Sequence, residues 1–260
     1  MAPSPHRPLA LITGVGRRRS IASAIAAGLA QDGWDLLLNY WQPYDERLGL
    51  ERGEDDAHTI ADDCRELGAE AILVPADLSD PDVPHQLLAS RPAGRTVSGL
   101  VLSHCESVDS SIATTDVESW DRHFAVNARA SWLLVKAFAE QLPAAPPSPG
   151  AVTGRIVALT SDHTANNLPY GASKGALDRL VIAAALELAD LGVRSNLINP
   201  GPIDTGWMDD QLRHDLTRAT PAGRLGTPQD TADLVRFLFS DAGSWINGQL
   251  LHSNGGFQTT

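Results

Sequence analysis

The chain has 260 residues, of which 43% are hydrophobic and 20% are charged, and its formal net charge is −12. This length suits one large α/β domain better than two ordinary domains, and the average composition excludes general disorder. The 20 basic residues are scattered, so we expect no nucleic-acid partner. The only cysteines, Cys64 and Cys105, form no C-x-x-C pair, which fits a reducing cytoplasm and argues against a disulfide framework.

The chain also lacks the sequence features of export and of membrane insertion. The segment Met1 to Pro8 has no apolar h-region, and no later stretch reaches the roughly 18 apolar residues of a membrane span. We therefore expect a cytoplasmic protein that does not associate with a membrane.

Short β-rich runs alternate with longer helical patterns along the whole chain. The predicted strands are Leu9 to Thr13, Asp35 to Asn39, Ala71 to Val74, Gly99 to Leu102, Arg155 to Leu159, Val193 to Ile198 and Gln249 to His252. The predicted helices are Ile21 to Gln31, Ala57 to Leu67, Asp82 to Leu88, Val117 to Gln141, Tyr170 to Leu191 and Gln229 to Phe239. Parallel neighbouring strands need crossover connections, so this alternation predicts a Rossmann-type, doubly wound parallel sheet with helices on both faces.

Two irregular stretches interrupt the pattern. We interpret Pro143 to Gly150 as a surface loop, because strands and helices resume directly after it and residues 1–260 then form a single domain. The second stretch, about 200–228, follows the sixth strand and contains a short helical pattern around Met208 to Thr217. Loops at the carboxyl ends of parallel strands form the ligand crevice, so we expect this stretch to be a substrate lid.

A turn of small residues connects the first strand to the first helix. It has the sequence Thr13-Gly14-Val15-Gly16-Arg17-Arg18-Arg19-Ser20-Ile21-Ala22. Such a turn lets backbone N–H groups and a helix N-terminus contact a pyrophosphate, which makes Gly14, Gly16, Ser20 and Ile21 candidate cofactor-binding residues. The spacing is not G-x-G-x-x-G, and taken alone the turn fits a plain tight turn equally well.

The end of the second strand indicates which nicotinamide cofactor fits. An acid there would bind the ribose 2′-hydroxyl of NAD, whereas this strand ends at Asn39 and no acid follows until Asp45. The guanidinium groups of Arg17, Arg18 and Arg19 lie in the neighbouring turn and suit a phosphate. We therefore predict NADP(H) in preference to NAD(H), the alternative being a solvated basic turn.

The most specific pattern in the chain is a tyrosine four residues before a lysine. The chain has three tyrosines and two lysines, and one of each stands as Tyr170-Gly171-Ala172-Ser173-Lys174. The i, i+4 spacing places both side chains on one helix face. A phenol can transfer a proton near neutrality when an ammonium beside it favours the phenolate. Tyr170 and Lys174 are therefore the candidate catalytic pair.

With these motifs the chain resembles the short-chain dehydrogenase/reductase family over nearly its whole length, and its ketoacyl-reductase-like branch in particular. The resemblance depends on the Tyr170–Lys174 pair, on the strand ending in Thr160-Ser161, and on the run from Asn199 to Thr205. It implies that Ser161 polarises a substrate carbonyl, that Lys174 also binds the nicotinamide ribose, and that Asn127 holds a water in the proton relay.

The resemblance also implies the remaining cofactor contacts and the assembly. The residues concerned are Asp77 and Leu78 near the adenine, and Pro200, Gly201, Ile203 and Thr205 near the nicotinamide. The implied activity is NADP(H)-dependent reduction of a ketone, or oxidation of a secondary alcohol, on a small-molecule substrate. A homotetramer or dimer built partly on the helices Val117 to Gln141 and Tyr170 to Leu191 is also implied.

Three departures from the family pattern accompany this resemblance. The cofactor turn is about two residues longer than the common form, and Leu102-Ser103-His104-Cys105 replaces the usual N-N-A-G. Tyr170 follows Ser161 by nine residues, about four fewer than is usual, which predicts a compact loop and a more open substrate pocket.

Three alternatives stay open. The run from Gly14 to Ser20-Ile21-Ala22 is similar to the turn of enoyl-thioester reductases in the same superfamily, although that branch spaces its tyrosine and lysine further apart. The altered loops would also fit a catalytically silent NADP-binding sensor. A metal site at His104, Cys105 and His163 is the least favoured, because lone histidines near a crevice are usually polar lining, and we expect no metal.

Overall fold

The computed structural model describes residues 7–50, 53 and 55–257, and a parallel sheet lies at its centre. Within these residues the sheet has seven strands in the order β3-β2-β1-β4-β5-β6-β7. They are β1 (Leu9–Ile12), β2 (Asp35–Tyr40), β3 (Ala71–Pro75), β4 (Val97–Leu102), β5 (Gly154–Leu159), β6 (Val193–Asn199) and β7 (Leu250–His252). The predicted strands and the Rossmann-type, doubly wound sheet are therefore confirmed.

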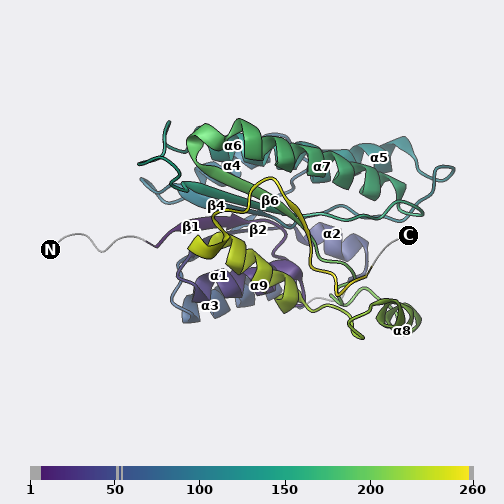
Figure 1. The fold of residues 1–260 in the computed structure, drawn as a ribbon. Coiled ribbons are helices and arrows are strands. Elements are labelled where there is room, and N and C mark those ends of the chain that lie inside the picture. Colours follow the sequence, from purple (N-terminus) through teal and green to yellow (C-terminus); the bar gives the residue numbers. More distant parts are fainter. Residues whose placement is uncertain (1–6, 51–52, 54, 258–260) are drawn as a thin grey trace.

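Helices cover both faces of this sheet (Figure 1). One layer contains α4 (Val83–Ala89), α5 (Val117–His123), α6 (Ala130–Glu140) and α7 (Leu168–Glu187). The other layer contains α1 (Ile21–Gln31), α3 (Asp56–Glu66) and α9 (Pro228–Phe239). The helices α2 (Gln42–Arg47) and α8 (Asp210–Ala219) lie toward the carboxyl ends of the strands, outside these two layers.

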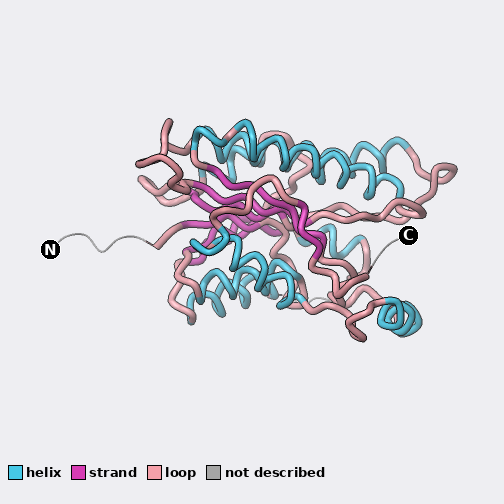
Figure 2. The backbone as a smooth tube through the Cα atoms, in the orientation of Figure 1, coloured by secondary structure: helices cyan, strands magenta, loops and turns pink. Residues whose placement is uncertain are grey.

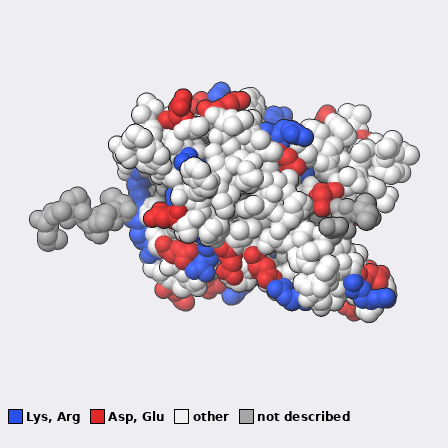
Figure 3. Space-filling model, in the orientation of Figure 1, with Lys and Arg blue, Asp and Glu red and all other residues white. Residues whose placement is uncertain are grey.

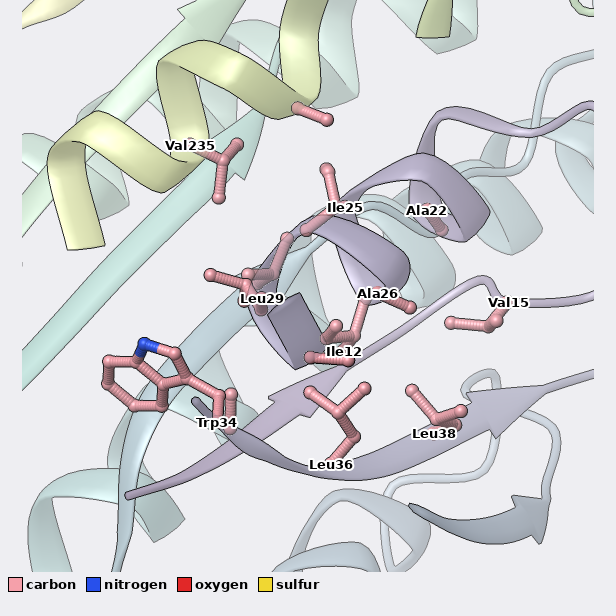
Figure 4. Packing of buried hydrophobic residues seen from close by; sticks show 14 of the residues in the cluster. Ile12, Val15, Ala22, Ile25, Ala26, Leu29, Trp34, Leu36, Leu38 and Val235 are labelled. Atoms are coloured by element: carbon pink, nitrogen blue, oxygen red, sulfur yellow. The ribbon is translucent and has the colours of Figure 1, made fainter. Parts of the chain in front are cut away.

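The strands are apolar because side chains on both faces are buried. On β1, Ala10 and Ile12 belong to the core beneath α1, α3 and α9, whereas Leu9 and Leu11 belong to the core beneath α4, α6 and α7. Successive side chains of a strand point to opposite faces, so one short run supplies both cores. Figure 4 shows the first of these cores, with Ile12 packed among side chains of β2 and α1.

Local signals place the ends of several elements. The hydroxyl of Ser20 accepts a hydrogen bond from the Ser23 N–H at 3.1 Å, which caps α1 directly after the cofactor turn. Glycines with a positive φ follow three of the helical segments, at Gly33, Gly68 and Gly192, where a residue without a Cβ is favoured. These caps fix where the chain leaves one face of the sheet and re-enters a strand.

The single helix predicted for residues 117–141 is wrong in one respect. The chain forms α5, then a π-helical segment, η1 (Phe124–Arg129), and then α6. Single-turn π segments are frequent at functional sites, and this one carries Asn127. The 3.6-residue periodicity of the sequence does not reveal the wider turn, because apolar residues continue on the same face.

The structure also describes the loop predicted for residues 143–150 and the helix predicted for residues 170–191. Residues 143–150 form a loop between α6 and β5, and the strands before and after that loop belong to the same sheet. The predicted helix 170–191 begins earlier, at Leu168, and ends in a short 3-10 turn, η2 (Ala189–Leu191). No helix among the described residues is long and apolar enough to cross a bilayer. Residues 1–6, on which the expectation of no export signal partly rests, lie outside the described part of the chain.

Candidate active site

The loops after the strands gather at the carboxyl edge of the sheet (Figure 2). Residues of these loops line a crevice. It encloses about 230 Å³ and is lined from the loops after β1 to β6. The predicted site residues that line it are Gly14, Gly16, Arg17, Ser20, Ile21, Asn39, Asp77, Leu78, Tyr170, Lys174, Pro200 and Thr205. Those that lie outside its lining are Arg18, Arg19, Asn127, Ser161, Gly201 and Ile203.

The cofactor turn lies against the loop that follows β4. Gly14 has a φ of +79°, and a Cβ there would lie 3.0 Å from backbone atoms of Ser103 and His104. A side chain is therefore excluded both by the backbone conformation and by space. Because this close approach brings the turn and the N-terminus of α1 to the crevice, backbone N–H groups there can meet a phosphate.

The three arginines of the turn diverge. Arg17 lines the crevice, where its Nη1 donates to the Thr205 carbonyl at 2.9 Å and its Nε lies 3.1 Å from Asp45 Oδ1. Arg18 and Arg19 are exposed, and they form ion pairs with Asp63 and Asp204, outside the crevice lining. Of the three arginines in the turn, Arg17 alone therefore lines the crevice.

The end of β2 differs from its prediction in a similar way. Asn39 is buried, and its Nδ2 donates to the carbonyls of Val74 and Ala76 at 3.2 Å each, so its amide fastens β2 to the end of β3. Asp45 also lines the crevice, because α2 turns the chain back toward the cofactor turn. The position of Asp45 in the crevice was not predicted, because the six residues of α2 have no apolar periodicity that indicates a helix.

Two further charged residues of the crevice were not predicted. Glu106, which is 2% exposed, is paired with Arg122 at 3.1 Å and with Arg47. Arg122 also lies 3.6 Å from Asp77, whose Oδ1 accepts the Ser79 N–H at 2.8 Å. The predicted adenine-side acid is thus part of a network that closes this end of the crevice. Charged residues that come from two loops and two helices carry no joint sequence signal.

Tyr170 and Lys174 lie on one face of α7, as their spacing predicts. The Lys174 Nζ is 5.7 Å from the centroid of the Tyr170 ring and donates to the Leu159 carbonyl at 2.8 Å. Burial lowers the pKa of Lys174, although Cys105 and Asp178 oppose that effect. Burial likewise raises the pKa of Tyr170 above its ordinary value, against a hydrogen bond from the side chain of Ser161. Tyr170 is therefore a protonated phenol at neutral pH.

Ser161 lies directly after β5, beside this pair. Its hydroxyl accepts the backbone N–H of His163 at 3.2 Å and lies near enough to the Tyr170 phenol to oppose the rise in that phenol's pKa. The neighbouring Thr160 lines the crevice, but its hydroxyl donates to the carboxylate of Asp178. The structure thus places the predicted serine, rather than the preceding threonine, against the tyrosine hydroxyl.

The short segment between Ser161 and Tyr170 is compact and packs on the start of α7. Asn166 takes a left-handed φ of +64°, a conformation that asparagine tolerates. A Cβ on Gly171 would lie 2.0 Å from the carbonyl oxygen of His163, so the backbone of the segment touches the helix. The glycine directly after Tyr170 is what allows this short connection.

Asn127 lies behind the crevice. Its Oδ1 accepts the Glu106 N–H at 2.7 Å, and its Nδ2 donates to the Glu106 carbonyl and the Ser173 hydroxyl at 2.9 Å each. Its buried amide therefore joins the π segment, the loop after β4 and α7. This arrangement holds the position of α7, on which Tyr170 and Lys174 stand.

His104 replaces the usual polar residues after β4 with a buried imidazole. Its Nε2 is 3.0 Å from the Val126 carbonyl, which only accepts, so Nε2 carries the proton and Nδ1 accepts from the Thr13 hydroxyl at 2.7 Å. Burial lowers the pKa of His104 to about 3. Within the described ranges, no three His, Cys, Asp or Glu side chains form a cluster suited to a metal ion.

The segment after β6 brings part of its predicted set to the crevice. Pro200 and Thr205 line it, whereas Ile203 is buried and pairs with Gly226 in an isolated bridge. Gly201 has a φ of +64°, and a Cβ there would lie 2.4 Å from Asn254. This packing anchors the base of the segment 200–228, which carries α8 at its outer end (Figure 1).

Comparison with known proteins then defines the class. A family model described as enoyl-(acyl carrier protein) reductase matches residues 14–258. The uncharacterized oxidoreductase YjdA of Bacillus subtilis (strain 168) is 33% identical over 256 residues, which cover 96% of each chain. The chloroplastic NADPH-dependent aldehyde reductase-like protein of Arabidopsis thaliana is 32% identical over 263 residues, covering 96% of this chain and 93% of that protein.

A solved structure agrees with these relatives. The angucycline C-6 ketoreductase LanV, crystallised with bound NADP, superposes with a TM-score of 0.82 at 26% identity, covering 96% of this chain and 95% of that chain. The chain therefore belongs to the short-chain dehydrogenase/reductase family of oxidoreductases, as its motifs predicted.

Proposed function

We propose that the protein is an NADP(H)-dependent carbonyl reductase that converts a ketone to a secondary alcohol, and the reverse. The observation that carries this proposal is the phenol of Tyr170, which lies near the side chains of Ser161 and Lys174 in a crevice that begins at a dinucleotide-type turn. A proton donor, a second hydroxyl and a cation together suit a carbonyl oxygen that gains negative charge.

The catalytic roles follow from these positions. Bound NADPH would supply the hydride that reduces the carbonyl carbon. The hydroxyls of Ser161 and Tyr170 hydrogen-bond the carbonyl oxygen, and Tyr170 then gives its proton to that oxygen as the charge develops. The raised pKa of Tyr170 keeps the phenol protonated before the reaction, and the ammonium of Lys174 stabilises the phenolate afterwards.

Residues of the crevice suit NADP(H). Gly14 and the N-terminus of α1 offer backbone N–H groups, and the guanidinium of Arg17 can bind a phosphate. The LanV structure with bound NADP and the NADPH-dependent relative support the same cofactor. Lys174 would hold the nicotinamide ribose, and Asp77 the adenine end.

Enoyl-thioester reduction is a second candidate, because the matching family model carries that description and the turn ending in Ser20-Ile21 is similar to that branch. The four-residue spacing of Tyr170 and Lys174 favours carbonyl chemistry. A panel of ketones, aldehydes and an unsaturated acyl thioester, assayed with NADPH and with NADH, separates the two. Oxidation of NADPH with a ketone alone supports our proposal; oxidation with the thioester alone supports the rival, and binding without turnover supports a silent sensor.

We further propose a homotetramer or dimer, formed partly by α5, α6 and α7. Val117, Trp132 and Leu186 expose 76%, 52% and 76% of their surface on these helices, and a second copy packed on the helices would bury this apolar surface. Figure 3 also shows a broad uncharged area on the face of the molecule that is in view. Light scattering on the purified protein measures the assembly directly. The cytoplasmic location stays a prediction.

A further inference from the structure

The unpredicted helix α2 lies across the proposed cofactor crevice. In Figure 1 it lies beyond the carboxyl edge of the sheet, level with the strands and between the two helix layers. Trp41, Tyr44 and Asp45 all line the crevice together with the cofactor turn and Tyr170. The helix is therefore part of the wall that a dinucleotide would meet.

Three contacts hold α2 in this position, and each reaches a different point. Asp45 pairs with Arg17 of the cofactor turn at 3.1 Å. The phenol of Tyr44 lies beside Cys105, whose side-chain hydrogen bond contributes to the raised pKa of Tyr44, and both residues line the crevice with Tyr170. Arg47 pairs with the buried Glu106. The helix is thus fastened to the loop after β1 and to the loop after β4, which are two of the loops that line the crevice.

Arg17 extends this arrangement to the other side. The same guanidinium that pairs with Asp45 donates to the Thr205 carbonyl at 2.9 Å, so it joins α2 to the segment after β6. The side chains of Arg17 and Asp45 are only 14% and 9% exposed. Asp45, Arg17 and Thr205 therefore connect α2 to the segment after β6 across the crevice.

The small volume of the crevice is consistent with α2 lying across it. It encloses about 230 Å³, whereas sites for drug-sized ligands usually enclose about 300–1,000 Å³. A nicotinamide dinucleotide is larger than a typical drug, and the side chains of Tyr44 and Asp45 occupy part of the wall that it would contact. The helix that carries them, α2, has only six residues.

We propose that α2 is an internal competitor of the cofactor. This inference rests on the proposed NADP(H) function. Asp45 engages the guanidinium that a phosphate of the dinucleotide would otherwise bind, and Tyr44 fills space beside Cys105 and Tyr170. Binding therefore exchanges a carboxylate for a phosphate at Arg17 and displaces α2 outward. A phosphate can make this exchange because guanidinium binds both groups by the same charge-assisted hydrogen bonds.

The first test compares the affinity of two variants for NADPH, measured by the change in NADPH fluorescence on binding. We expect Asp45→Asn and Tyr44→Ala each to bind NADPH about fivefold more tightly than the natural chain, which corresponds to about 1 kcal/mol. Asp62→Asn is the matched control, because it removes the same charge from an exposed pair with Arg65 on α3. Weaker binding by both test variants, with an unchanged control, would mean that α2 helps to hold the cofactor and would overturn the proposal.

The second test uses hydrogen exchange of the natural chain with and without NADPH, so it does not depend on a variant that folds. We expect NADPH to slow exchange in residues 14–21 and to accelerate it in residues 42–47. Slower exchange in both segments would overturn the proposal while leaving the proposed function intact. If NADPH changes neither the exchange nor the fluorescence, both the proposed function and this inference are wrong.

Discussion

The hydroxyl of Thr160 donates a hydrogen bond to the carboxylate of Asp178, one turn beyond Lys174 on α7. Burial raises the pKa of Asp178, and this hydrogen bond opposes the effect. Thr160 therefore supports a half-buried acid behind Lys174, while Ser161 reaches the hydroxyl of Tyr170. Two adjacent hydroxyl residues at the end of β5 have different roles, and the difference can be tested.

We expect Ser161→Ala to lower kcat by about 10²-fold or more, the scale of one lost oxyanion donor, with little change in the free energy of unfolding. Thr160→Val should instead lower the free energy of unfolding by about 1–3 kcal/mol, because Asp178 loses its partner. Steady-state kinetics and urea unfolding of both variants separate the two effects. Near-full activity of Ser161→Ala, with the loss confined to Thr160→Val, would show that the catalytic hydroxyl belongs to Thr160.

Two glycines on α7, Gly171 and Gly175, allow a controlled test of how tightly the loop before Tyr170 packs on the helix. A Cβ on Gly175 would meet no neighbouring atom within 4 Å, so Gly175→Ala should stabilise the protein by about 0.5–1 kcal/mol. Gly171→Ala should destabilise it and lower kcat, because the new methyl group meets the His163 carbonyl at 2.0 Å and shifts the loop beside Tyr170. Thermal unfolding and kinetics of both variants measure this. Equal stabilisation by the two substitutions would refute the tight packing at Gly171.

His104 makes stability depend on pH. Its pKa of about 3 in the folded protein lies below the ordinary value of 6.5, so between these values the unfolded chain binds a proton that the folded chain excludes. The free energy of unfolding should be largest above about pH 6.5 and fall on acidification, by up to about 1.4 kcal/mol per pH unit. Urea unfolding between pH 7 and 4.5 measures the slope, which His104→Gln should reduce.

The control for that slope is His163→Gln, since His163 is exposed. It should leave the pH dependence unchanged. Because His104→Gln could disturb the loop after β4, the imidazole signal of the natural protein provides a second measurement. We expect the His104 signal not to titrate above pH 5, and a titration near pH 6.5 would contradict the buried neutral ring.

The arginines of the cofactor turn should contribute unequally. Arg17→Ala should raise the KM for NADPH by about tenfold or more, since it removes the one guanidinium of the trio that lines the crevice. Arg18→Ala and Arg19→Ala should change it by less than about twofold, because these exposed side chains pair with acids outside the crevice. The KM for NADH, measured in parallel, shows whether Arg17 binds the 2′-phosphate, because NADH lacks that group. Equal losses for all three variants would contradict the structural assignment.

The strands and the placement of Tyr170 and Lys174 on one helix face could be predicted from the sequence, because both depend on local patterns. β1 to β7 are short apolar runs bounded by turn residues, and the spacing of Tyr170 and Lys174 is a property of any helix. The cofactor turn was placed by its position after β1, and the φ of Gly14 agrees with that placement. These features need no knowledge of distant contacts.

The remaining features depend on contacts between distant segments. Asp45 reaches the crevice only because α2 folds back, and Glu106 matters because Arg47 of α2 and Arg122 of α5 approach it from two helices. Likewise, three consecutive arginines predict a basic cluster, but the acids that draw two of them aside come from elsewhere in the chain. Such long-range pairs are invisible to spacing and periodicity.

The most direct test of the central claim is single-turnover oxidation of NADPH by the Tyr170→Phe variant with a ketone that the natural enzyme reduces. The variant loses the proton donor but keeps the ring, so we expect turnover to be abolished while the affinity for NADPH stays within about twofold. Lys174→Ala, in comparison, should weaken both turnover and binding. Turnover by Tyr170→Phe at the rate of the natural enzyme would contradict the proposal that Tyr170 is the proton donor.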